Sequence, residues 1–279
     1  MNKFIHFNGK ILPADDLLVS AGNRGLRYGD GLFETMRVVN GRIVLQDLHF
    51  DRLFQGLSVL QFQCPPLFTP AYLAEAILAL CHKMAIHQAA RVRLNIVRGN
   101  GGLYDAENHA PQVIIEAWPL DVPRGLHENG LVIDIYHSAR KHFDVLANIK
   151  SNNYLPYVLA ALYARQNRLN DCLLLNTEGR VCDATIANVF WVNEGRLFTP
   201  PLSEAGVGGV MRRYLIENTS RQYPVHEEPL TPEMLEQADE LFLTNAIQGI
   251  KWVGQYKDKK YTNKLTSLLY NEYIKKLWE

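Results

Sequence analysis

The chain has 279 residues, of which 47% are hydrophobic and 21% charged, enough to bury a core in one large domain or two modest ones. Lysine plus arginine equals aspartate plus glutamate at 29 each, so no basic surplus points to nucleic acid or a lipid surface. No stretch is long and apolar enough to span a bilayer, and the start lacks a secretory signal. The four cysteines have no metal-like spacing, so we expect reduced thiols in a cytoplasmic protein without a metal site.

The first part of the chain predicts short strands and two helices. FIHFN-GK-ILPA and ETMRVV-NG-RIVLQ each place an Asn-Gly turn between apolar runs, which is typical of a hairpin. Asp47 is a candidate cap for a first helix, and Thr69 with Pro70 opens a second, AYLAEAILALCHKM. RVRLNIVRG and PQVIIEAWPL predict further strands. We therefore expect a small α+β domain over residues 1–118.

A segment rich in proline, glycine and charge, WPLDVPRGLHENG, predicts a linker at residues 119–125. A larger domain over residues 126–279 should follow. Its expected helices are NYLPYVLAALYARQNRL with Pro156 in the first turn, VMRRYLIENTS, PEMLEQA and the C-terminal TNKLTSLLYNEYIKKLW. CLLLN-TEG-RVCDA and NVFWVN-EG-RLFTP predict two more hairpins.

Lys150 is the first candidate for chemistry. Most lysines are solvated surface charges, but this one lies in the mostly uncharged stretch LANIKSNNYL between a strand and a helix. Partial loss of solvent disfavours the ammonium form and yields an amine that can form a Schiff base. A Schiff-base cofactor with a phosphate and a pyridine ring, such as pyridoxal phosphate, would make further demands on the chain.

The phosphate requires backbone amides and a guanidinium. AGVGGVMRRYL places three glycines directly before a helix, so the amides of Val210 and Met211 could point at an anion, although a flexible turn explains the glycines equally well. Arg52 in DLHFDRL is the candidate guanidinium; most helical arginines are simply solvated.

The pyridine nitrogen requires a carboxylate that keeps it protonated. Asp183 lies in the apolar run RVCDATIANVFWV, where a carboxylate is costly unless it is paired. The alternative is a turn or edge residue that caps nearby amides. Tyr154 could donate to the phenolic oxygen of the ring, or it could belong to the core.

These stretches resemble the fold-type IV pyridoxal-phosphate family, which includes branched-chain aminotransferases, D-amino acid aminotransferases and 4-amino-4-deoxychorismate lyases. Six segments match in the family's order: NRGLRYGDGLFET, LHFDRL, NIKSNNYL, VCDATIANVFWV, AGVGGVMR and ADELFLTNAIQGI. The implied fold is α+β with two domains, a small α/β-sandwich N-terminal domain and a larger β-barrel-like C-terminal domain that carries the lysine, with the cofactor between them and a homodimer completing the site.

By position, the resemblance makes Lys150 the Schiff-base lysine and proton shuttle. It assigns the phosphate to Arg52, the Val210 and Met211 amides and Asn245, and the phenolic oxygen to Tyr154. Asp183 stands where the family usually has glutamate, so its shorter side chain must approach the ring from closer backbone or through water.

The substrate, a small molecule, is the least determined feature. TPPLSEAGVGGVMRRYL and QADELFLTNAIQGIKWV are more similar to aminodeoxychorismate lyases of the folate pathway, whereas FET at 33–35 and Tyr154 suit aminotransferases equally. Arg93 and Arg98 are candidates to bind a substrate carboxylate, because a guanidinium fork matches a planar anion, but each could be a strand-edge or loop charge. Tyr28, in the N-terminal signature, is a third candidate. We favour the lyase, with an aminotransferase as the alternative and an inactive cofactor-binding homologue as a third hypothesis.

Overall fold

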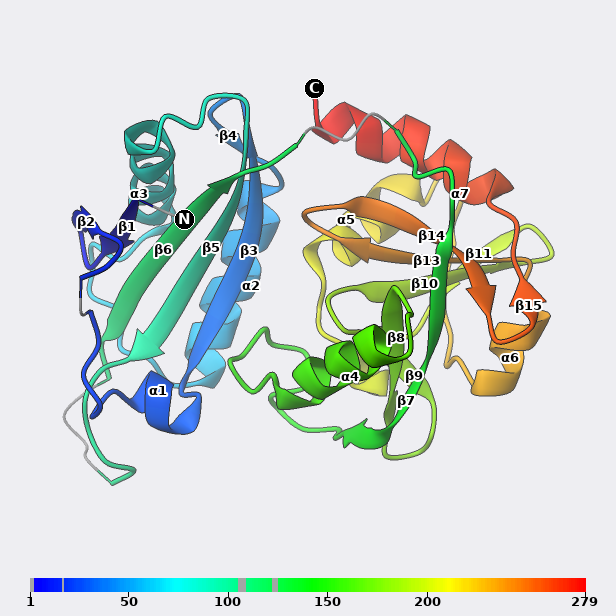
Figure 1. The fold of residues 1–279 in the computed structure, drawn as a ribbon, viewed down its shortest axis with the longest axis horizontal. Helices are drawn as coiled ribbons and strands as arrows, with labels where there is room; N and C mark the ends of the chain where they lie inside the picture. The colour runs from blue at the N-terminus through cyan, green and yellow to red at the C-terminus, as the bar shows by residue number, and fades with distance from the viewer. Residues whose placement is uncertain (1–2, 17, 105–108, 122–124) are drawn as a thin grey trace. The chain divides into compact units, whose positions relative to one another are not determined.

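The computed structural model describes residues 3–16, 18–104, 109–121 and 125–279 (Figure 1). The chain divides into two compact units, which are described separately. Unit 1 comprises Met1–Val122 and Ile149–Asn153, and unit 2 comprises Pro123–Asn148 and Tyr154–Glu279. Of the linker expected at residues 119–125, residues 122–124 lie outside the described part of the chain.

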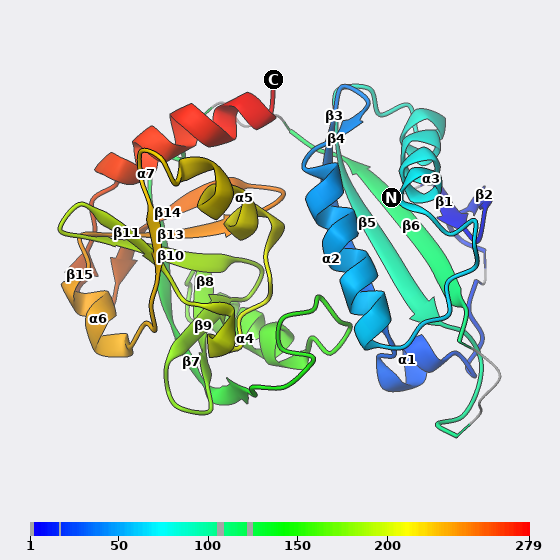
Figure 2. The same ribbon diagram turned by 180° about the vertical axis from the view of Figure 1, so that it is seen from behind.

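Unit 1 is a six-stranded sheet with two long helices on one face (Figures 1 and 2). The strand order is β2-β1-β6-β5-β3-β4. The bounds are β1 Phe4–Phe7, β2 Lys10–Pro13, α1 Arg24–Tyr28, β3 Gly31–Val39, β4 Arg42–Ile43, α2 Gln46–Val59, α3 Pro70–Lys83, β5 Ala89–Arg98 and β6 Pro111–Pro119. Apolar side chains of α2 and α3 pack with those of β3, β5 and β6 in one core, which holds the sheet and helices together.

The expected hairpins of unit 1 are confirmed. Asn40 and Gly41 both have positive φ, 48° and 75°, the turn geometry that matches the twist of two antiparallel strands. Thr69 caps α3 by accepting from the Tyr72 amide, as expected. Asp47 is not a cap: α2 begins at Gln46, and Asp47 lies in its first turn, where a carboxylate favours the positive end of the helix dipole.

Unit 2 is built on a nine-stranded mixed sheet in the order β12-β11-β10-β13-β14-β7-β8-β9, with β15 paired to β14. Its strands are β7 Leu131–Lys141, β8 Asp171–Asn176, β9 Val181–Ala184, β10 Asn188–Asn193, β11 Arg196–Thr199, β12 Val225–Glu227, β13 Glu240–Asn245, β14 Gly249–Tyr256 and β15 Lys259–Lys260. Side chains of β7 to β11, β13 and β14 enter a single core, and β9 at one end of the path contacts β10 near the other. The sheet therefore curls around its core, as a barrel-like domain requires.

The expected helices of unit 2 are present. They are α4 Leu155–Gln166, α5 Val210–Thr219, α6 Pro232–Gln237, and the C-terminal run of α7 Lys264–Leu269, η2 Tyr270–Ile274 and η3 Lys275–Leu277. A short helix that was not expected, η1 Leu202–Glu204, precedes the glycine loop. Helix α4 packs against β7 and β8 (Figure 1). No helix in the described ranges has the length and apolar content needed to cross a membrane.

The segment that carries Lys150 lies with unit 1, although the sequence suggested the larger C-terminal domain. The Phe33 amide donates to the Lys150 carbonyl at 2.9 Å, and the Asn152 amide donates to the Gly31 carbonyl at 2.9 Å. These bonds extend β3 at its first residues by a short bridge between Leu32 and Ser151. Pairing with β3 therefore decides to which unit the segment belongs.

Candidate active site

Lys150 is fixed by its backbone and by an aromatic ring. Its Nζ lies 4.5 Å from the centroid of the Phe33 ring, and Phe33 is the same residue whose amide binds the Lys150 carbonyl. An aromatic face stabilises the ammonium form by a cation–π contact while excluding water on one side. The hydrogen bond and the ring contact thus give the lysine a defined position beside β3.

Glu34, His49 and Arg52 form a buried polar cluster in unit 1. The Arg52 Nε donates to Glu34 Oε1 at 2.8 Å and its Nη2 donates to Oε2 at 2.5 Å, a bidentate pair. His49 Nδ1 lies 2.7 Å from Glu34 Oε2. His49 and Arg52 are three residues apart on α2 and therefore share one face.

The pKa values of this cluster follow from burial and charge. Burial alone would raise the pKa of Glu34, but the charges and hydrogen bonds of Arg52 and His49 outweigh it and lower that pKa to about 2. Burial lowers the pKa of His49, so a neutral ring donates from Nδ1. Its Nε2 is buried without a hydrogen-bond partner among the described residues.

Arg93 and Lys150 contact the same Phe33 ring, whereas Arg98 is paired within the fold. The Arg93 guanidinium carbon is 3.9 Å from the centroid of the same Phe33 ring, and its Nε donates to Asn95 at 3.1 Å. Arg98 is buried, and it pairs with Asp30 at 3.0 Å and donates to the Leu60 carbonyl. Those contacts are typical of a structural ion pair, so we do not carry Arg98 into the proposed substrate pocket.

Tyr28 is the last residue of α1 and is 45% exposed. The Arg24 guanidinium carbon lies 5.9 Å from the centroid of its ring. Its exposure leaves the expectation of a substrate contact open.

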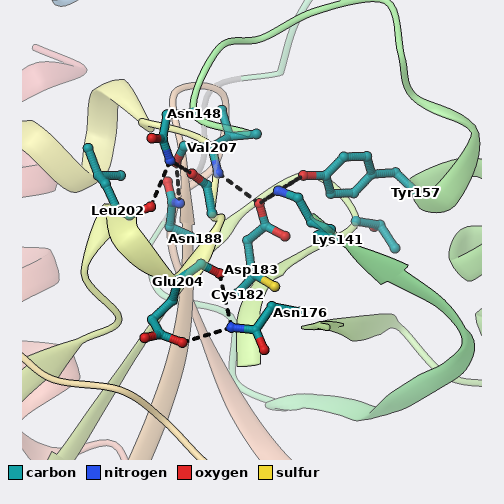
Figure 3. Close-up of polar contacts among 12 residues, drawn as sticks. Lys141, Asn148, Tyr157, Asn176, Cys182, Asp183, Asn188, Leu202, Glu204 and Val207 are labelled. Atoms are coloured by element: carbon teal, nitrogen blue, oxygen red, sulfur yellow. Dashed lines mark hydrogen bonds and ion pairs between the residues drawn. The ribbon is translucent and has the colours of Figure 1, made fainter. Parts of the chain in front are cut away.

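Asp183 is the centre of the polar cluster of unit 2 (Figure 3). It lies on β9 and is buried. Its Oδ2 accepts from Lys141 Nζ at 2.9 Å, from the Tyr157 hydroxyl at 2.9 Å and from the Val207 amide at 3.0 Å. Its Oδ1 is buried and has no partner among the described residues. An unsatisfied carboxylate oxygen is costly, so its position favours a donor that the polypeptide itself does not supply.

Two asparagines hold the glycine loop that precedes α5. Asn188 Nδ2 donates to the Val207 carbonyl at 2.7 Å, and Asn148 Nδ2 donates to the Gly206 carbonyl at 2.6 Å (Figure 3). A Cβ on Gly209 would lie 1.7 Å from Asn188 Oδ1. Gly209 is therefore required by the close approach of Asn188, which makes the loop a held structure instead of a flexible turn.

The first turn of α5 presents amides with no side-chain cap. Gly209 is the N-cap residue, and glycine has no side chain with which to accept from the first amides. Val210 and Met211 begin the helix, where exposed amides and the dipole favour an anion. Asn245, at the end of β13, accepts the Ile247 and Gln248 amides at 3.0 and 2.8 Å through Oδ1 and so shapes the turn that follows.

Tyr154 precedes α4 and stacks on Tyr157, with ring centroids 4.4 Å apart. Its hydroxyl donates to the Thr185 carbonyl at 2.9 Å, two residues after Asp183. The tyrosine therefore belongs to the Asp183 cluster, and its role toward a phenolic oxygen remains a prediction.

Residues 31–256 match the family described as Amino-transferase class IV. The chain belongs to that family. Its members are pyridoxal-phosphate-dependent enzymes, so this chain is one too. The unpartnered Asp183 oxygen fits a protonated ring nitrogen, and the uncapped start of α5 fits a phosphate.

The class IV relatives include both reaction types. A protein from Methanocaldococcus jannaschii, to which a branched-chain-amino-acid aminotransferase activity is ascribed, is 33% identical over 93% of this chain and 90% of its own length. The Pseudomonas aeruginosa 4-amino-4-deoxychorismate lyase structure is 30% identical, with a TM-score of 0.81 over 96% of this chain and 99% of that chain. The branched-chain aminotransferase of Thermoproteus uzoniensis, solved with norvaline, has a TM-score of 0.89 at 22% identity over 99% and 94% of the two chains.

Sequence reasoning missed several residues of the two polar clusters. Neither Lys141 nor Tyr157 was predicted as a site residue, and Glu34 appeared only within the FET motif. A signal was available for Glu34, because an acid within the apolar run GLFETMRVV must be paired. Asn148, Asn188 and Lys141 gave no such signal, since their partners are distant in sequence.

Proposed function

We propose that Lys150 carries the cofactor and that the chain is a 4-amino-4-deoxychorismate lyase, which yields 4-aminobenzoate and pyruvate. The observation that carries the cofactor assignment is the buried Asp183 carboxylate, which has three donors on one oxygen and none on the other among the described residues. Lys150 Nζ would hold the aldehyde carbon covalently, and Arg52 with the Val210 and Met211 amides would hold the phosphate.

When bound, pyridoxal phosphate supplies a ring that withdraws electrons from the substrate carbon next to the amine. The residues of the chain supply the rest. Asp183 Oδ1 would accept the ring N–H and keep that proton in place. Lys150, released from the cofactor by the substrate amine, would remove and return a proton at Nζ. Arg93, which like Lys150 contacts the Phe33 ring, would bind a substrate carboxylate.

The Arg52–Glu34 pair supports the phosphate assignment. Two of the Arg52 nitrogens are fixed by Glu34, which fixes the plane of the guanidinium. A fixed plane costs less side-chain entropy when an anion binds. The Pseudomonas aeruginosa lyase, which matches over 96% of this chain and 99% of its own length, supports the lyase proposal.

An aminotransferase is the second candidate, and the Methanocaldococcus jannaschii relative favours it. Such an enzyme would use branched-chain or D-amino acids with 2-oxoglutarate. Both reactions require the same lysine, phosphate site and ring carboxylate. The residues that line the substrate pocket decide between them.

We also propose a homodimer. Leu155, Val158, Leu159 and Leu162 form an apolar stripe at helical spacing on α4, and Leu155 is 70% and Leu162 50% exposed. An exposed stripe of this kind is typical of a protein–protein contact, and a second copy would cover it in a symmetric pair. Light scattering should give twice the chain mass, and Leu159→Glu should shift it toward the monomer.

One experiment tests the cofactor lysine. The purified protein is incubated with pyridoxal phosphate, reduced with borohydride and digested, and the labelled peptide is identified by mass spectrometry. We expect the label on Lys150 in the wild type and none on that peptide in Lys150→Ala. Label on Lys141 instead would overturn the assignment.

Substrates then separate the reactions. Aminodeoxychorismate should give pyruvate and 4-aminobenzoate in equal amounts. Branched-chain or D-amino acids with 2-oxoglutarate should give glutamate only if the enzyme is an aminotransferase. Cofactor attachment without either product would favour the inactive homologue.

A further inference from the structure

Lys141 is a second lysine in the polar cluster around Asp183. It is the last residue of β7, and its side chain is 9% exposed. Its Nζ donates to Asp183 Oδ2 at 2.9 Å and also to the Tyr157 hydroxyl (Figure 3). A buried ammonium is strongly unfavourable unless it is paired and hydrogen-bonded. The Lys141 ammonium and the Asp183 carboxylate therefore stabilise each other in this buried position.

The three donors to Asp183 come from three separate elements. Lys141 lies on β7, Tyr157 on α4 and Val207 in the glycine loop, and all three bind Oδ2. Donors from three directions fix the rotation of the carboxyl group, so that Oδ1 is left without a partner among the described residues. Asp183 Oδ1 is therefore already oriented before a donor binds to it, which lowers the entropic cost of binding that donor.

Lys141 is also the charge that compensates Asp183. Among the donors that the described residues bring to this carboxylate, only the Lys141 ammonium is charged. Burial and the nearby Asp183 charge raise the pKa of Tyr157, so its hydroxyl stays a neutral donor. The other titratable groups that face this cluster are acidic or neutral: Tyr154, Asp171, Cys182 and Glu204.

We propose that Lys141 is a positioning residue that supplies the charge paired with Asp183 and turns the Oδ1 of that carboxylate toward the ring nitrogen of the cofactor. The part that concerns the ring rests on the function proposed above for Asp183.

The positive charge of Lys141 has a second consequence for the same site. When the ring nitrogen is protonated, two cations share one carboxylate, and their repulsion weakens the hold on the ring proton. Removal of Lys141 should abolish this repulsion. The ring proton would then be retained to higher pH.

The first arm of the test uses cofactor-free protein, so it does not depend on the proposed function. Unfolding by urea is measured for the wild type, Lys141→Met, Asp183→Asn and the double variant. We expect Lys141→Met to lower the folded-to-unfolded ratio by about 100-fold or more at pH 8. In the Asp183→Asn background the same change should cost far less, because Lys141 has already lost the carboxylate with which it pairs.

The second arm titrates pyridoxal phosphate into the wild type, Lys141→Met, Lys141→Arg and Lys257→Met, and follows visible absorbance against pH. Lys257 forms an exposed ion pair with Glu236 and is the matched control. Lys141→Met should still label Lys150 with borohydride, but its spectral transition should move to higher pH. Lys141→Arg should restore the wild-type profile, and Lys257→Met should match it.

The outcomes separate the two proposals. Additive stability effects in the double variant, or an unchanged pH profile in Lys141→Met, would overturn the role of Lys141. No visible absorbance and no Lys150 label in the wild type would overturn the proposed function instead. The urea unfolding of the four cofactor-free proteins shows whether Lys141 and Asp183 are coupled, whether or not the proposed function is correct.

Discussion

Arg52 and Glu34 form a two-point ion pair in which Glu34 is buried and its carboxylate also binds His49. The pair links β3 to α2, the two elements that hold the lysine segment and the proposed phosphate arginine. Cofactor retention and the stability of unit 1 should therefore change together when this pair is altered.

Arg52→Ala tests that link. Loss of one charged hydrogen bond to the phosphate should weaken pyridoxal-phosphate affinity by about 1.5–3 kcal/mol. The same change leaves Glu34 buried without its main partner, which should lower the free energy of unfolding by about 3–5 kcal/mol. Equilibrium dialysis and urea unfolding measure the two effects. The control is Arg213→Ala, which removes an exposed ion pair with Glu217 and should change each quantity by no more than about 1 kcal/mol. Unchanged affinity in Arg52→Ala would mean that another group holds the phosphate.

The Glu34–His49 pair predicts loss of stability in acid. The pKa of Glu34 is lowered from 4.5 to about 2, so its contribution is complete above 4.5 and is lost as pH falls toward 2. The pKa of His49 is lowered from 6.5, so the unfolded chain takes up that proton first and stability begins to fall below pH 6.5. Urea unfolding of the cofactor-free protein from about pH 3 to pH 8 checks this. In Glu34→Gln, the free energy of unfolding should depend less on pH in the acidic range, because the variant lacks the Glu34 carboxylate.

Gly209→Ala should disturb the loop before α5. The added Cβ would lie 1.7 Å from Asn188 Oδ1, whereas a Cβ on Gly208 would lie 3.3 Å from the Asn148 carbonyl. We expect Gly209→Ala to cost about 1–3 kcal/mol of stability and to weaken cofactor binding, because Asn188 must move. Gly208→Ala should have a smaller effect on both. Stability is measured by differential scanning calorimetry and cofactor binding by titration. If Gly208→Ala and Gly209→Ala had equal effects on both, the role assigned to Asn188 would be contradicted.

Asp183→Asn should impair chemistry more than cofactor attachment. The amide keeps the shape of the side chain but cannot stabilise a protonated ring nitrogen. We expect kcat to fall about tenfold or more, equivalent to about 1.4 kcal/mol of barrier. Borohydride labelling of Lys150 should persist. Wild-type turnover in this variant, measured as product release under saturating cofactor, would rule out the ring-nitrogen role.

The sequence determined the elements and the family. Short-range signals located the turn at Asn40–Gly41, the cap at Thr69 and the helix start after Gly209, because each depends on residues within a few positions. The order of the motifs also singled out Lys150, Arg52 and Asp183, since their neighbours along the chain carry the resemblance.

The tertiary structure decided which groups those residues contact. Lys141 and Asp183 are 42 positions apart in the sequence, and Asn188 donates to the carbonyl of Val207, 19 positions away. No local sequence pattern predicts such pairs. The segment of Lys150 belongs with β3 because of hydrogen bonds to residues more than a hundred positions earlier. Burial then assigns the chemistry: a lysine or carboxylate has no special property in the sequence until folding removes its water and supplies its partners.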